Sequence, residues 1–95
     1  MKEDVENAVV EFTNHAAKIY SWFFNQFRNS IRNINRRKEE NVYKMQLAKY
    51  SFEFKKQMEE HMKLLTDSHP EIYKSVLSEK INYYLLAFWQ KCLAL

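Results

Sequence analysis

The stretch Arg28–Lys38 is the part of the chain whose residue types most readily suggest chemistry. It reads RNSIRNINRRK, with five basic side chains, three asparagines and no acid. Basic side chains contact phosphate oxygens, and asparagine amides hydrogen-bond to phosphates or base edges. Neutralising phosphates releases counterions, so such a cluster supplies salt-sensitive affinity for a nucleic acid. The candidate contacts with a nucleic acid or an acidic partner are Arg28, Arg32, Arg36, Arg37, Lys38 and Lys44.

The surrounding charge pattern favours a structural role for this stretch. The whole chain carries a net charge of only +3, and Glu39 and Glu40 follow the basic residues directly. No aromatic residue is interleaved with them, as a site for single-stranded nucleic acid requires. Asparagine side chains also bond to the nearby backbone in ways that compete with a helix. The stretch is therefore predicted to be a corner between two helices, with nucleic-acid binding as the alternative function.

The histidines and the single cysteine form no recognised catalytic or metal-binding motif. Glu11 and His15 are four residues apart on one helix face, but no H-E-x-x-H or C-x-x-C accompanies them, so an ion pair is expected. His61 falls on an apolar stripe, which predicts a semi-buried histidine. Cys92 lies in the most apolar segment, where burial makes a thiol inert. Since the absence of glycine also excludes phosphate-binding loops, we expect no enzyme, cofactor, metal or small-molecule substrate.

The elements that carry these residues are predicted to be helices. The chain has no glycine and one proline, whereas sheets and loops use glycine for tight turns. Apolar residues recur every three or four positions, as expected for helices with one buried face. The first stripe is Val5, Val9, Phe12, Ala16, Ile19, Phe23, Phe27, Ile31 and Ile34, and the second is Tyr43, Leu47, Tyr50, Phe54, Met58, His61 and Leu65.

These stripes predict an all-α fold, an antiparallel three-helix bundle, in a single domain covering residues 1–95. From Ile34 to Tyr43 is about 2.5 helical turns, so an unbroken helix would place the two stripes on opposite sides. A break within residues 29–38 restores a common core, although a swapped dimer with one continuous long helix is an alternative. Ser68 and Glu71 have the spacing of a capping box, which predicts a third helix from about His69 to Leu93.

The first and third helices carry more apolar surface than one buried stripe needs. In the segment 81–95, INYYLLAFWQKCLAL, twelve of fifteen residues are apolar. Either the large side chains are half-buried with their polar atoms in water, or they form a surface for a partner. Aromatic enrichment in interface cores favours the partner surface. The predicted apolar anchors are Trp22, Phe24, Leu86, Trp89 and Leu93.

These features predict a small non-enzymatic helical interaction protein that acts as an adaptor, regulator or inhibitor. It is expected to dock on a protein partner, a second copy of itself, or both, and possible nucleic-acid binding through the basic corner is the alternative. The acidic beginning of the chain lacks the layout of a signal peptide, and no apolar run approaches the length of a membrane span. We therefore expect a cytoplasmic protein in a reducing compartment.

Overall fold

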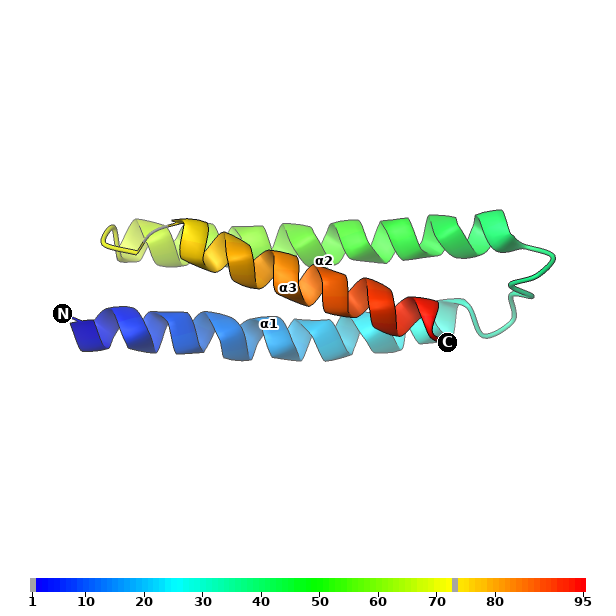
Figure 1. The fold of residues 1–95 in the computed structure, drawn as a ribbon, viewed down its shortest axis with the longest axis horizontal. Coiled ribbons are helices and arrows are strands. Elements are labelled where there is room, and N and C mark those ends of the chain that lie inside the picture. Colours follow the sequence, from blue (N-terminus) through cyan, green and yellow to red (C-terminus); the bar gives the residue numbers. More distant parts are fainter. Residues whose placement is uncertain (1, 73) are drawn as a thin grey trace.

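A computed structural model shows the chain as three long helices packed side by side (Figure 1). It describes residues 2–72 and 74–95, with side chains from residue 5 onward. The helices are α1 (Lys2–Ser30), α2 (Glu40–Ser68) and α3 (Lys74–Leu93). Each helix contacts both others, and the direction of the chain reverses at each connection. The antiparallel three-helix bundle predicted from the sequence is confirmed, as a rod with dimensions of 54 × 16 × 16 Å.

The first connection breaks the helix where the mismatch between the two apolar stripes requires it. Asn35 organises the turn, because its side-chain oxygen accepts hydrogen bonds from the backbone N–H groups of Arg37 (3.1 Å) and Lys38 (3.4 Å). Its backbone oxygen also accepts a bond from the N–H of Glu39, at 2.7 Å. In a continuing helix, these backbone N–H groups would bond to backbone oxygens of the preceding turn. Asparagine offers them another acceptor, and in this way it competes with the helix. The predicted break is therefore confirmed, with α1 ending at Ser30 and α2 beginning at Glu40.

The second connection differs from the sequence prediction. Ser68 is the last residue of α2, so it does not cap a third helix, and the predicted helix start near His69 is wrong. The backbone of His69 is already extended, with φ −131° and ψ 78°, because the ring of Pro70 disfavours helical geometry in the residue before it. A turn bond from the Ile72 N–H to the His69 oxygen (3.0 Å) reverses the chain. Residue 73 lies outside the described residues, and α3 begins at Lys74.

The core is built around phenylalanines from all three helices. Phe54 of α2 lies 5.3 Å from Phe88 of α3 and 5.7 Å from Phe23 of α1, measured between ring centroids. Phe27 of α1 is also in contact with Phe88, at 6.5 Å. These tilted and edge-on pairs have the geometry that aromatic rings prefer. The buried apolar side chains are Ala8, Phe12, Ala16, Phe23, Phe24, Phe27, Tyr43, Leu47, Phe54, Met58, Leu65, Ile72, Leu77, Ile81, Phe88 and Cys92.

Candidate protein interface

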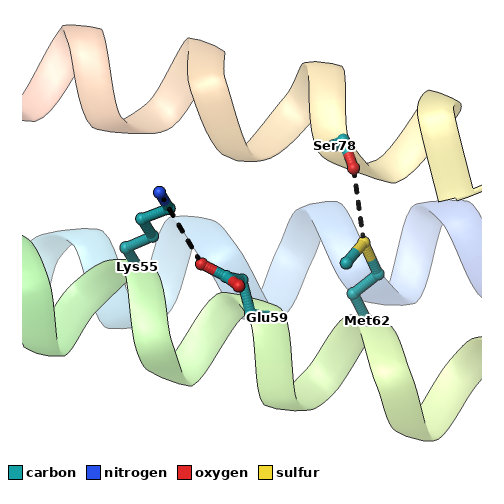
Figure 2. Close-up of polar contacts among 4 residues, drawn as sticks. All are labelled: Lys55, Glu59, Met62 and Ser78. Carbon is teal, nitrogen blue, oxygen red and sulfur yellow. Dashed lines mark hydrogen bonds and ion pairs between the residues drawn. The ribbon is translucent and has the colours of Figure 1, made fainter.

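The groove between α2 and α3 brings polar and apolar side chains of the two helices together. Ser78 of α3 donates a hydrogen bond across the groove to the sulfur of Met62, at 3.7 Å (Figure 2). On α2, one turn away, Lys55 forms an ion pair with Glu59 at 3.9 Å. Because Lys55, Glu59 and Met62 are spaced by four and three residues, they mark the edge of α2 that borders α3.

Two adjoining hollows open along this edge of α2. The larger has a volume of about 530 Å³ and the smaller about 240 Å³. Both are lined by Lys55, Glu59 and Met62, so the two hollows lie next to each other. The larger hollow reaches Phe52 in one direction and Lys74 of α3 in the other, while the smaller includes Asn82 of α3. A hollow this size beside two helices can accept side chains from another molecule.

Large exposed apolar side chains follow along the same two helices. Leu86, Trp89 and Leu93 follow Asn82 by four, seven and eleven residues, which places them on the same flank of α3. On α2, Met45 precedes Phe52 by seven residues and shares its face. These five side chains are between 44% and 70% exposed to solvent. We call this surface the α2–α3 face; it consists of Met45, Phe52, Leu86, Trp89 and Leu93.

The structure separates the five apolar anchors predicted from the sequence. Leu86, Trp89 and Leu93 share one flank of α3, whereas Phe24 is only 8% exposed and belongs to the core. The ammonium group of Lys91 lies 4.3 Å from the Phe24 ring, a cation–π contact that joins α3 to α1. Trp22 is 55% exposed but lies four residues after Lys18, which lines a hollow with His61 of α2. Trp22 therefore belongs to the α1–α2 side of the bundle.

Sequence reasoning missed Met45 and Phe52, which complete the surface on α2. They are seven residues apart and lie outside the buried stripe of α2, so the periodicity of that stripe does not predict them. An apolar pair at heptad spacing on an otherwise charged helix face is the signal that could have found them.

The basic corner is exposed, but one of its arginines makes defined contacts within the bundle. The Nη1 of Arg36 donates hydrogen bonds to the backbone oxygens of Leu93 (2.9 Å) and Leu95 (3.0 Å). Its guanidinium also lies 4.6 Å from the ring of Tyr43, whose hydroxyl donates to the backbone oxygen of Cys92. The last carbonyls of a helix have no partners within it, and a cation there also interacts favourably with the helix dipole. Arg36 therefore caps α3.

The other basic residues of the corner point to solvent. Arg28 lies in the last turn of α1, and Arg32, Arg37 and Lys38 are exposed in the connection. Lys44 forms an ion pair with Glu40 at 3.3 Å, with both side chains about two-thirds exposed, so the pair contributes little to stability. The corner thus presents four exposed cations at one end of the rod, together with one arginine engaged in the fold.

Arg36→Ala is expected to lower the free energy of unfolding by about 1 kcal/mol, because two charge-assisted hydrogen bonds to the end of α3 are lost. Arg37→Ala is the matched control, with an expected change of less than about 0.5 kcal/mol for an exposed side chain. Urea unfolding followed by circular dichroism compares the two. Equal effects of both substitutions would contradict the capping role of Arg36.

Two histidines from different helices meet at the α1–α2 side. The ring centroids of His15 and His61 are 4.2 Å apart, and His61 also stacks on Phe12 at 5.8 Å. Burial lowers the pKa of His61, His15 lowers it further, and Glu11 opposes these effects. These surroundings favour the neutral form of His61, as expected for a semi-buried packing residue. Among the described side chains, those of residues 5–72 and 74–95, no three His, Cys, Asp or Glu are grouped so that they could hold a metal ion.

Cys92 is fully buried and carries a free thiol. Burial raises its pKa to about 12, against a smaller lowering effect of Lys91. A thiol reacts as its thiolate, so Cys92 is poorly suited to nucleophilic chemistry.

None of the helices, over the residues that the structure covers, is long and apolar enough to cross a membrane. Comparison with protein-family models, with curated proteins and with solved structures finds no match to this chain. The case for a function therefore depends on the surfaces described above.

Proposed function

We propose that this chain is a non-enzymatic interaction protein, an adaptor, regulator or inhibitor, that binds another protein through the α2–α3 face. The observation that carries the proposal is that five large apolar side chains are exposed on α2 and α3, three of them on one flank of α3 and two on one face of α2. Isolated exposed apolar residues are common, but a contiguous patch on a small protein usually marks an interaction site. Trp89 is the expected anchor, because binding hot spots are enriched in tryptophan.

The ionisable groups with shifted pKa values also support a binding role over catalysis. The pKa values of Tyr20, Tyr43 and Cys92 are raised and that of His61 is lowered, and burial is the largest cause in every case. Tyr43, Cys92 and His61 contact core or capping residues, so their surroundings explain the shifts without a catalytic role. The buried free thiol of Cys92 is in keeping with the cytoplasmic, reducing compartment that we include in the proposal.

Self-association is one form of the same proposal. A two-fold dimer uses the same patch on both copies, so Leu86, Trp89 and Leu93 of one copy would pack against those of the other. Such a dimer needs about 800 Å² of surface from each partner to be stable.

Nucleic-acid binding by the basic corner is the second candidate. It is supported by the four exposed cations Arg28, Arg32, Arg37 and Lys38 at one end of the rod. It ranks below protein docking because the nearby Arg36 is engaged in capping α3. Binding of this kind would weaken steeply with salt.

The proposal is tested by photo-crosslinking in the cells that make the protein. A benzophenone amino acid is placed at Leu86, on the α2–α3 face, or at Asn25, an exposed position on α1. We expect adducts of discrete mass from position 86, which are lost when Trp89→Ala is added, and none from position 25. An adduct of twice the chain mass would identify the self-associating form. Similar diffuse labelling from both positions would count against the α2–α3 face as an interface.

A further inference from the structure

The lining of the α2–α3 groove has a definite chemical character. Phe52 and Met62 are the large apolar side chains that line the larger hollow, together with the methylene stems of the lysines. The lysines around it are Lys55, Lys56, Lys63 and Lys74, and the acids are Glu59 and Glu60. Four lysines and two glutamates leave a net charge of +2, and the ion pair with Glu59 already occupies Lys55. The excess positive charge therefore lies on Lys56, Lys63 and Lys74.

The exposed apolar and lysine side chains of α2 are spread over the length of a helix. From Met45 to Lys63, α2 rises about 27 Å, the length of a helix of about 18 residues. The two helices that border the groove lie alongside each other in the rod (Figure 1). A further helix placed along such a groove packs against two neighbours, as in a four-helix bundle. One half of the groove offers exposed Leu86, Trp89 and Leu93, and the other offers the lysines.

We propose that the α2–α3 groove binds an acidic amphipathic helix of a partner protein, which lies along the rod as a fourth helix. This inference rests on the function proposed above and names the chemistry of the partner. Apolar side chains of the helix, spaced by three and four residues, contact Phe52, Leu86 and Trp89. Its acidic side chains lie beside Lys56, Lys63 and Lys74, where complementary charge speeds association and selects the partner.

A second copy of this chain fits the full groove less well. In a two-fold dimer along the groove, antiparallel α2 helices would bring Met45 of one copy opposite Lys63 of the other. The lysine-rich half of each copy would then lie against the apolar half of the other copy. Lys56 and Lys63 would therefore gain no acidic partner. A partner helix with separate apolar and acidic positions matches both halves at once.

Two synthetic peptides of about 18 residues test this inference. Both carry leucines at the same helical positions, and their remaining positions are mainly glutamate in one and mainly lysine in the other. Fluorescence anisotropy of each labelled peptide is followed as the full chain is added, at low and at near-physiological salt. We expect the acidic peptide to bind at least about tenfold more tightly, with the difference shrinking as salt rises.

Charge reversal in the groove provides the matched control. The double substitution Lys56→Glu with Lys63→Glu is expected to abolish or reverse the preference for the acidic peptide. Lys18→Glu with Arg28→Glu changes the net charge equally, but on α1 and away from the groove, and is expected to retain the preference. Trp89→Ala is expected to weaken binding of the acidic peptide about tenfold or more, with the helical signal in circular dichroism unchanged.

The outcomes separate this inference from the proposed function. Equal binding of both peptides, lost in Trp89→Ala, would overturn the acidic preference and leave the α2–α3 face as a docking surface. No binding of either peptide, with discrete crosslinks from Leu86 retained, would overturn the helix as occupant and leave the proposed function. A dimer in light scattering that Trp89→Ala dissociates would replace the partner helix with a second copy. No peptide binding and no specific crosslink would overturn both proposals.

Discussion

Phe88→Ala is expected to lower the free energy of unfolding by about 3–5 kcal/mol, the usual cost of removing a fully buried phenylalanine. Phe88 is 0% exposed, and its ring is in contact with those of Tyr20, Phe27 and Phe54 from the other two helices. The substitution leaves a cavity where all three helices meet. Because small domains are stable by only about 5–15 kcal/mol, the variant keeps a small fraction of that stability or unfolds.

Leu86→Ala is the matched control, two residues away on the same helix. Leu86 is 61% exposed on the α2–α3 face, so its truncation is expected to change the free energy of unfolding by less than about 0.5 kcal/mol. Urea unfolding of both variants, followed by circular dichroism, gives the comparison. A loss of more than 2 kcal/mol in Leu86→Ala, or of less than 1 kcal/mol in Phe88→Ala, would contradict the packing described for α3.

The buried stripes could be predicted from the sequence because they depend only on helical periodicity. Phe12, Phe23 and Phe27 share one face of α1 in any straight helix, and Leu47, Phe54 and Met58 share one face of α2. Their mismatch across residues 34–43 then required the break that Asn35 provides. These are local properties, so one sequence is enough to derive them.

The interface could be predicted only in part, because it depends on how the helices approach each other. Periodicity could not decide between Phe24 and Trp22, which lie on either side of the α1 stripe. The approach of α3 covers Phe24 with Lys91, while Trp22 remains exposed on the other side. Periodicity also could not predict the contacts of Arg36, because its hydrogen-bond acceptors are 57 and 59 residues away in the chain. Contacts at such separations are set by packing, which no local pattern encodes.

The start of α3 was misplaced for a different reason. Ser68 and Glu71 have the spacing of a capping box, but α2 continues through Ser68 before Pro70 ends it. Two local rules compete here, and the restriction that proline places on the preceding residue prevailed. Burial of Ile72 against the end of the core adds a tertiary contact that the capping pattern does not include.

Cys92 in the folded chain is expected to react with an aromatic disulfide reagent at least about a thousandfold more slowly than in the urea-unfolded chain at pH 8. With a pKa of about 12, only about one thiol in ten thousand is ionised at that pH. An unperturbed cysteine, with a pKa of about 8.5, is about one-quarter ionised. Full burial of the sulfur also blocks the reagent, so labelling is expected to require opening of the bundle.

The absorbance of the released aromatic thiolate measures the labelling rate, and a Leu86→Cys variant with Cys92→Ala is the exposed control. That control should react at nearly the unfolded rate, because position 86 lies in solvent. Adding Phe88→Ala to the wild-type chain should accelerate labelling of Cys92 by about a hundredfold or more, since each 1.4 kcal/mol of lost stability raises the open population tenfold. Rapid labelling of Cys92 in the folded wild-type chain would contradict its burial near the beginning of α2. If labelling of Cys92 is slow and Phe88→Ala does not change its rate, the reagent reaches Cys92 when the end of α3 opens locally, without unfolding of the core.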